Sequence, residues 1–268
     1  MKNLDEILTT MGRAGRRLDE MGPVEAGAGN LSFSTTQDLD LGFRFNQTDT
    51  LELPWTVPAL AGRTVLVTGS GCRLRDVLED PEANVSAVVV DEGGATGRWH
   101  YAQRRQFAGP TSEFNSHLAV HEDQVKTRGV QQQTLVHAQP PYLVQLSHIA
   151  VLRNDHDFNR AILRWEPETI VQLPDGIKVL DFMLPGGQEL MENNVLGLRD
   201  HRVTLWSKHG LMARSDTSPL DVVDKIEYAE AGAMYELRNR QAGGEGEGLS
   251  DDELRRVIEA FSVSTTLY

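Results

Sequence analysis

The stretch LVHAQPPYLVQLSH, residues 135–148, changes from a strand pattern to a helix pattern at a histidine. An apolar run leads to His137, and two prolines follow at 140–141, where proline is tolerated in the first turn of a helix. We therefore predict a short strand over 133–137, ending in a histidine that can emerge into a cleft, and then a helix. Two residues after His137, where a second imidazole on the same side would complete a metal clamp, the chain has Gln139.

Strand and helix patterns follow one another irregularly on both sides of this stretch. Short apolar or alternating runs predict strands in LSFST (31–35), TVLVTGSG (64–71), NVSAVVVD (84–91), GRWHYAQ (97–103) and VTLWSKHGLMA (203–213). Helical spacing and capping residues predict helices over 4–21, 112–127 and 218–241, with a last helix after the capping box of Ser250 and Glu253. This order predicts an α/β fold with three α/β/α layers and a mixed, mainly antiparallel central sheet.

The second half of the chain contains one further expected pair of strands. ETIVQL (168–173) and IKVLDF (177–182) are joined by Pro174-Asp175-Gly176, which is typical of a type I or II turn and predicts a hairpin. No repeat or linker divides the chain, so we predict a single domain over 1–268, in which an N-terminal helical segment, 1–22, could be loosely attached. The Gly/Glu-rich stretch 242–250 is expected to be a flexible joint.

Composition and charge exclude several classes of protein. Acidic residues outnumber basic ones by 39 to 26, and the net charge of -13 disfavours nucleic acid and anionic membranes as partners. The single Cys72 excludes an internal disulfide and indicates a reducing compartment. The N-terminus lacks the basic and apolar regions of a signal peptide, and no apolar stretch approaches the roughly 20 residues of a membrane span. We therefore expect a soluble cytoplasmic protein.

Glycine-rich turns next to strands provide candidate anion sites. GAGN (27–30) and TGSG (68–71) are suited to presenting backbone N–H groups to an anion, although a tight hairpin or a strand exit explains either one. Thr111 and Ser112 stand at the start of a predicted helix, where N–H groups also point outward. Together the three turns predict a phosphate cradle.

A second set of residues has the chemistry of metal ligands. Glu113, His117 and His121 are spaced i, i+4 and i+8, so they lie along one face of a helix. The alternatives are that Glu113 interacts with the helix dipole and that His121 belongs to the surface or to helix packing. His137 ends a strand and His209 lies in a turn between two others; with Glu113 they form a set of suitable ligand types.

These motifs occur in a familiar order. GAGNLS, TGSG, PTSE, the His137 strand, WEPETIVQLPDG and SKHGLMA resemble the class II sugar-phosphate aldolases of the aldolase–epimerase–adducin superfamily. The tract through Glu168 and Pro174-Asp175-Gly176 is most similar to the rhamnulose-1-phosphate aldolase branch. The resemblance extends from the first predicted helix to the last.

The resemblance implies both an assembly and a reaction. The family has an α/β/α fold, a four-fold symmetric homotetramer with sites at subunit interfaces, and a divalent zinc ion. Its members reversibly cleave a deoxy-ketose 1-phosphate, such as rhamnulose 1-phosphate, into dihydroxyacetone phosphate and an aldehyde. Cleavage leaves an enediolate, which zinc can stabilise as a Lewis acid in the absence of a lysine Schiff base.

Roles follow from the resemblance residue by residue. His137 and His209 match metal ligands, and Glu113 matches a carboxylate that binds the metal or acts as a base near it. Glu168 matches the acid/base residue at the aldehyde end. Substrate-binding and phosphate-binding positions are matched by Asn30, Ser70, Gly71, Thr111 and Ser112.

The sequence departs from the family pattern at two positions. Gln139 replaces the second histidine of the usual His-x-His, and Gly27 replaces an asparagine that is frequent in the rhamnulose branch. An amide oxygen is a weaker zinc ligand than imidazole and is acceptable to harder cations such as manganese or magnesium. His148 is a poor substitute, since helical rise places it roughly 11 Å beyond His137. We expect a functional but altered site, in which Gln139 is a weak ligand or hydrogen-bonds a metal-bound water or substrate hydroxyl.

Two other functions are compatible with the same superfamily. One is an epimerase or dehydratase acting on a phosphorylated ketose, which would use the same enediolate stabilisation. The other is a non-catalytic, adducin-like binding protein. The presence of Glu113, Glu168, His137 and His209 argues against the latter, because a scaffold needs none of them.

Overall fold

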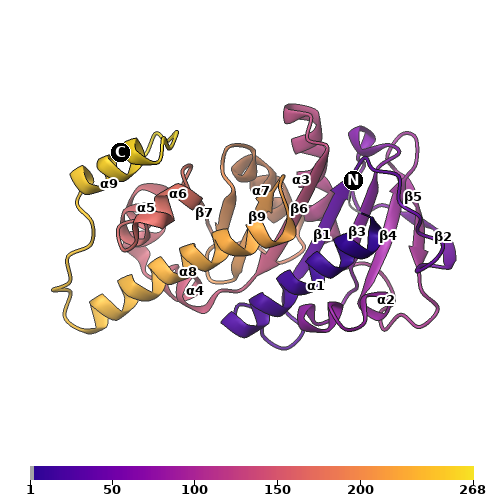
Figure 1. The fold of residues 1–268 in the computed structure, drawn as a ribbon, viewed down its shortest axis with the longest axis horizontal. Coiled ribbons are helices and arrows are strands. Elements are labelled where there is room, and N and C mark those ends of the chain that lie inside the picture. Colours follow the sequence, from indigo (N-terminus) through magenta and orange to yellow (C-terminus); the bar gives the residue numbers. More distant parts are fainter. Residues whose placement is uncertain (1–2) are drawn as a thin grey trace.

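The computed structural model describes residues 3–268, and Figure 1 shows a central sheet with helices on both sides. The first two residues of the expected segment 1–22 lie outside this range. Within it the strand order is β2-β5-β4-β3-β1-β6-β9-β8-β7, antiparallel throughout except for β7 and β8. The strands are β1 (Asn30–Thr35), β2 (Gln47–Glu52), β3 (Thr64–Thr68), β4 (Val85–Val90), β5 (Thr96–Tyr101), β6 (Gln132–Ala138), β7 (Ile177–Leu180), β8 (Val203–Trp206) and β9 (Gly210–Ser215).

Helices cover both faces of this sheet (Figure 1). Helices α1 and α4 contact α8, which packs on β6 and β9, whereas α3 contacts α7, which packs on β7, β8 and β9. The predicted three-layer arrangement with a mixed, mainly antiparallel sheet is therefore confirmed. The helices are α1 (Leu4–Met21), α2 (Pro81–Asn84), α3 (Phe114–Arg128), α4 (Pro141–Leu146), α5 (Asp155–Ile162), α6 (Pro167–Gln172), α7 (Gln188–Asp200), α8 (Pro219–Gln241) and α9 (Asp251–Ala260), with short 3-10 turns η1 (Pro58–Leu60), η2 (Leu74–Val77) and η3 (Ala150–Leu152).

The central strand β1 shows how the layers share one strand. Its side chains alternate between the two faces of the sheet. Leu31 and Phe33 enter the main hydrophobic core, while the hydroxyl of Ser32 meets histidines of α3. All six residues of β1 are buried, because helices cover both faces at this point. The polar side of this strand therefore lies under a helix and not in solvent.

The expected hairpin over 168–182 is wrong. Its first half forms helix α6, with Pro167 in the first turn, because Thr169, Ile170 and Leu173 recur on one side and are buried there. A turn at Gly176, whose φ of 69° favours glycine, leads into β7. β7 then pairs parallel with β8 and has no strand partner from 168–173.

Several other boundaries differ from those expected. Helix α3 begins at Phe114, so Glu113 is its N-cap residue and not a member of its first turn. The edge strand β2 was not predicted, because its side chains are mostly exposed and carry no apolar alternation. The capping box of Ser250 and Glu253 is confirmed at α9. Among the described residues, no helix combines the length and apolar content needed to cross a bilayer.

Candidate metal centre

Strand register brings residues distant in sequence to one end of the sheet. Asn30, the first residue of β1, lies opposite His137 near the end of β6. β9 begins at Gly210 beside the same end of β6, since Leu211 pairs with Ala138. The turn that carries His209 is thereby held above β6.

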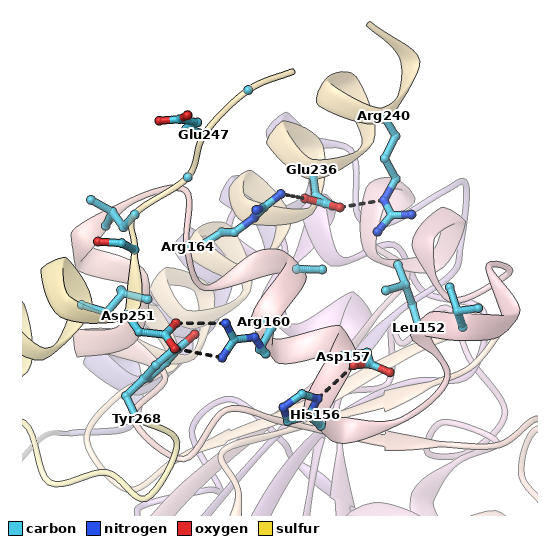
Figure 2. Close-up of a pocket in the computed structure, with 17 residues that line it drawn as sticks. Leu152, His156, Asp157, Arg160, Arg164, Glu236, Arg240, Glu247, Asp251 and Tyr268 are labelled. Carbon is cyan, nitrogen blue, oxygen red and sulfur yellow. Dashed lines mark hydrogen bonds and ion pairs between the residues drawn. The ribbon is translucent and has the colours of Figure 1, made fainter. Parts of the chain in front are cut away.

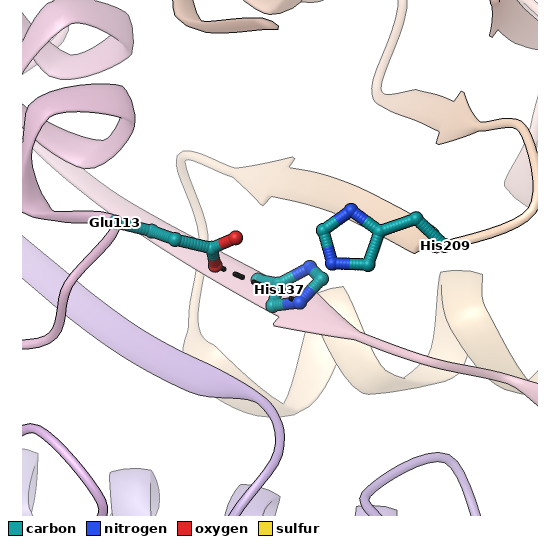
Figure 3. Close-up of side chains that lie close together, drawn as sticks. All are labelled: Glu113, His137 and His209. Atoms are coloured by element: carbon teal, nitrogen blue, oxygen red, sulfur yellow. Dashed lines mark ion pairs between the residues drawn. The ribbon is translucent and has the colours of Figure 1, made fainter. Parts of the chain in front are cut away.

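Glu113, His137 and His209 form one cluster at this end (Figure 3). One potential ligand atom from each residue lies within 4.8 Å of the others, and His137 Nε2 lies 3.6 Å from Glu113 Oε2. Two ligands of a tetrahedral zinc ion lie about 3.4 Å apart, because zinc–nitrogen bonds are near 2.1 Å. Separations of up to 4.8 Å therefore need to close by up to about 1.4 Å, through rotation of the side chains, for the three residues to share an ion.

The hydrogen bonds of the cluster leave lone pairs available on all three side chains. His137 Nδ1 donates to the carbonyl of Leu211 at 2.8 Å, so its Nε2 carries no proton when the ring is neutral and faces the Glu113 carboxylate as a second acceptor. Within residues 3–268, the buried Nδ1 of His209 has no hydrogen-bond partner. Burial lowers the pKa of His209, and the neighbouring His137 lowers it further. Converging acceptors without a donor between them fit a cation.

Trp206 supports the cluster and was not identified from the sequence. Its ring stacks on His137 with centroids 4.6 Å apart and planes inclined by 16°. The indole Nε1 donates to Asn194 Oδ1 at 3.0 Å, which fixes the ring from behind. The sequence signal that could have identified Trp206 was its position, three residues before the candidate ligand His209.

Gln139 lies beside the cluster. Its backbone N–H donates to the carbonyl of Pro23 at 2.7 Å. A Cβ atom added to Gly210 would lie 3.2 Å from Gln139 Cγ and 3.0 Å from His137 Cε1, so both side chains flank the same glycine. Among residues 3–268, the side-chain amide of Gln139 has no hydrogen-bond partner, which leaves it available to a ligand of the site.

Substituting Gln139 separates its two expected roles. We expect Gln139→His to raise zinc affinity, because it recreates a pair of imidazoles on one side of a strand. Gln139→Ala should lower turnover more than metal content if the amide hydrogen-bonds a ligand of the metal. Metal analysis of the purified variants beside their turnover measures both effects. Loss of metal from Gln139→Ala as complete as from His137→Ala would instead show that the amide is a ligand.

Two of the three turns expected to form the phosphate cradle lie side by side. A β-bridge joins Gly69 to Pro110, Ser70 N–H donates to the carbonyl of Gly109, and Thr111 N–H donates to that of Thr68, each at 3.0 Å. These bonds use two of the expected donors. Among the described residues, the N–H groups of Gly71 and Ser112 have no acceptor, so both can donate to an anion. The hydroxyls of Ser70, Thr111 and Ser112 can donate to the same anion.

The other candidate residues occupy different places. Asn30 Nδ2 donates to Glu113 Oε2 at 2.9 Å, so its amide is engaged with the cluster. His117 and His121 are fully buried on α3 and hydrogen-bond Ser32, and they are not part of the cluster. Glu168 is exposed in the first turn of α6 and also lies outside the cluster.

A cavity of about 830 Å³ opens elsewhere, between α5, α8 and the C-terminal segment (Figure 2). None of the residues that line it belongs to the cluster. Each arginine that lines it is paired with a carboxylate: Arg160 pairs with Asp251 at 3.0 Å, and Glu236 pairs with both Arg164 and Arg240. The cavity therefore has no unpaired arginine to bind the phosphate of a sugar phosphate.

Comparison with known proteins identifies the family of this chain. The family model described as Class II Aldolase and Adducin N-terminal domain matches residues 9–237. A rhamnulose-1-phosphate aldolase of Klebsiella pneumoniae subsp. pneumoniae is 31% identical over 214 residues, which are 80% of this chain and 76% of that protein. A second, from Mannheimia succiniciproducens, is 27% identical over 245 residues, which are 90% of this chain and 88% of that protein.

Solved structures agree with this similarity. The crystal structure of a sugar-phosphate aldolase from Thermotoga maritima superposes with a TM-score of 0.75 at 25% identity, and the match covers 89% of this chain and 96% of that one. The expected resemblance is confirmed: the chain belongs to the class II aldolase and adducin family, as an enzyme of the class II aldolase kind.

Proposed function

We propose that the protein reversibly cleaves a deoxy-ketose 1-phosphate, of the rhamnulose 1-phosphate kind, into dihydroxyacetone phosphate and an aldehyde. The observation that carries the proposal is the set of converging acceptors on Glu113, His137 and His209, next to two loops with free N–H groups. The names of the curated relatives support the choice of sugar phosphate. A non-catalytic protein would gain nothing from burying Glu113 and His137 beside a partly buried His209.

In this proposal His137, His209 and Glu113 hold a divalent cation. Two imidazoles and one carboxylate are a common set for zinc, which we propose as the native metal, with manganese or magnesium as alternatives because of Gln139. When bound, the ion supplies Lewis-acid stabilisation of the charge that develops on the enediolate.

The remaining steps are carried by side chains and backbone groups. Gly71 and Ser112 donate N–H groups to the phosphate, beside the N-terminus of α3, where anions are favoured. As the C3–C4 bond breaks, Glu168 accepts the proton of the C4 hydroxyl, which becomes the aldehyde oxygen. The enediolate then takes up a proton at C3 from water, relayed through the Glu113 carboxylate, which is ionised before and after the step.

We propose that Glu168 acts on a neighbouring subunit of a homotetramer. In one chain Glu168 is exposed on α6 and is not a member of the cluster. An exposed carboxylate on a rigid helix can reach the cluster of another copy when subunits pack side by side. This arrangement agrees with the interface sites that the family resemblance implies.

Product analysis of the untreated protein tests the function. With rhamnulose 1-phosphate we expect dihydroxyacetone phosphate to form, followed by a coupled dehydrogenase that oxidises NADH. Treatment with a chelator should abolish cleavage, and zinc should restore it. Appearance of an epimeric ketose phosphate without dihydroxyacetone phosphate would contradict the aldolase assignment and favour the epimerase alternative.

A variant at Gly71 tests the phosphate site. Gly71 has a φ of 75° and open space around its Cβ position, so Gly71→Val strains the backbone without a clash. We expect the KM for the sugar phosphate to rise at least about tenfold, since its N–H group would turn away. Gly62→Val is the matched control. Gly62 has a φ of 76° and equally open space at its Cβ position, but it lies before β3, whereas the candidate phosphate loop follows β3. An equal change of KM in both variants would contradict the assignment.

A further inference from the structure

A chain of buried hydrogen bonds begins at the candidate ligand Glu113. Asn30 Nδ2 donates to Glu113 Oε2 at 2.9 Å, and Asn30 Oδ1 meets Nε2 of His117. The hydroxyl of Ser32 then lies 2.7 Å from His117 Nδ1 and 2.8 Å from His121 Nε2. All five residues are less than 9% exposed, so water does not complete these contacts.

The chain continues along the face of the sheet that α3 covers, and reaches the surface. His121 Nδ1 lies 2.9 Å from Gln133 Oε1, and Gln133 Nε2 donates to Asp216 Oδ1 at 3.1 Å. Asp216 pairs with Arg128 at 3.0 Å, where both side chains are partly exposed. A carboxylate therefore stands at each end of the chain, and two histidines and a serine stand at its centre.

The end at Glu113 sets a direction for the nearby hydrogen bonds. An ionised carboxylate only accepts, so the amide nitrogen of Asn30 faces Glu113 and its oxygen faces His117. Burial lowers the pKa of His117 well below its usual value, so the ring is neutral. The proton of a neutral His117 must then be on Nε2, and its Nδ1 accepts from the Ser32 hydroxyl.

The end at Asp216 sets the opposite direction. Gln133 gives its N–H to Asp216, so its oxygen accepts the proton on Nδ1 of His121. Burial lowers the pKa of His121 to about 3, and the neutral ring therefore also presents an acceptor to Ser32. One hydroxyl proton faces two acceptors at Ser32. Leaving a buried acceptor unpaired costs stability, so apolar residues would serve a purely structural core better.

We propose that His117 and Ser32 are positioning residues, which act through Asn30 to hold the Glu113 carboxylate in place toward His137 and His209. The proposal rests on the proposed function, in which Glu113 binds the metal. The Nε2–H of His117 fixes the orientation of the Asn30 amide, and that amide fixes one oxygen of Glu113. Partners that orient metal ligands in this way commonly affect metal affinity by about 10- to 100-fold.

Zinc affinity of two matched variants tests the chain. His117→Leu removes the N–H toward Asn30, whereas His117→Gln keeps an amide N–H close to the same position. In competition with a chromophoric chelator, we expect zinc affinity to fall about 10- to 100-fold in His117→Leu and to stay within about threefold in His117→Gln. Zinc binding by His117→Leu equal to that of the parent would overturn the proposal, provided that circular dichroism shows it folded.

Serine variants give the same test with a smaller change of volume. Ser32→Ala should lower zinc affinity, because His117 Nδ1 loses its donor. Ser34→Ala is the control, since Ser34 is buried on the same face of β1 and its hydroxyl has no partner among residues 3–268. In a Glu113→Gln background, Ser32→Ala should have no further effect on zinc affinity. Additive losses would show that the chain does not act through Glu113.

The tautomer of His117 tests the chain without any metal. In long-range ¹H–¹⁵N spectra of the metal-free protein, assigned with His117→Gln, we expect the neutral Nε2–H form. The Nδ1–H form would overturn the proposal, because it cannot donate to Asn30. A parent protein that binds no zinc but shows the Nε2–H form would contradict the proposed metal site and still support the hydrogen-bond direction.

Discussion

Replacing His137 by alanine is expected to lower zinc affinity by more than about 100-fold, since loss of an outer partner of a ligand alone costs about 10- to 100-fold. His137 offers Nε2 toward Glu113 and belongs to a cluster whose ligand atoms lie within 4.8 Å of one another. Removing one of three protein ligands leaves too few to retain the ion. Metal analysis of the purified variant and the rate of sugar-phosphate cleavage measure the loss, and both should fall together.

A second histidine provides the control for this variant. His156 is exposed on α5, where its ring contacts Asp157, and it lies outside the cluster. His156→Ala should therefore keep the metal and the activity of the parent. Full metal content in His137→Ala, with the fold intact, would contradict the proposed centre. A variant that loses its fold is recognised by circular dichroism, and His209→Ala then repeats the test from the more accessible turn.

Adding a single methyl group at Gly210 is expected to disable the site almost as completely. A Cβ atom there would lie 2.5 Å from the carbonyl oxygen of Ala138 and 3.0 Å from His137 Cε1. The backbone of β6 and the ring of His137 cannot both stay in place, because β6 is paired on both of its edges. We expect Gly210→Ala to lower zinc affinity and turnover at least about tenfold, by the loss of oriented ligands, and to lower the melting temperature by several degrees.

Gly42→Ala is the matched control for this change. Gly42 has no positive φ, and its Cβ position is 3.8 Å from the nearest neighbour, an oxygen of Asp40. It should therefore tolerate alanine without any change of melting temperature or metal content. Metal content and turnover of Gly210→Ala at the level of Gly42→Ala would show that the close contact at β9 does not fix His137.

Local sequence patterns determined much of the fold and the identity of the candidate residues. The apolar run before His137, the alternation in β1 and the capping box of α9 are short-range signals, and each produced the expected element. The resemblance in motif order gave the family, which the comparisons confirm. The types of residue at 113, 137 and 209 indicated metal chemistry before any geometry was known. Their roles in catalysis stay predictions that the variants above test.

Where local signals conflicted, only the tertiary structure decided. ETIVQL has apolar residues that suit a strand or a helix, and packing on α8 and α9 selected the helix α6. The alternation in β1 indicated a strand but not what covers its polar side; in the structure Ser32 lies between two buried histidines of α3 and hydrogen-bonds both. Neither outcome could be predicted from the local sequence, because both depend on packing against distant elements.

The sequence could not show that the three candidate ligands lie close together. Glu113, His137 and His209 come from three elements separated by 24 and 72 residues along the chain, and they meet because β1, β6 and β9 pair in one fixed register. A shift of one residue in either pairing would turn every side chain of the strand to the opposite face. Register depends on the packing of the whole sheet between its helices, so the sequence supplied the candidate ligands and the tertiary structure placed them together.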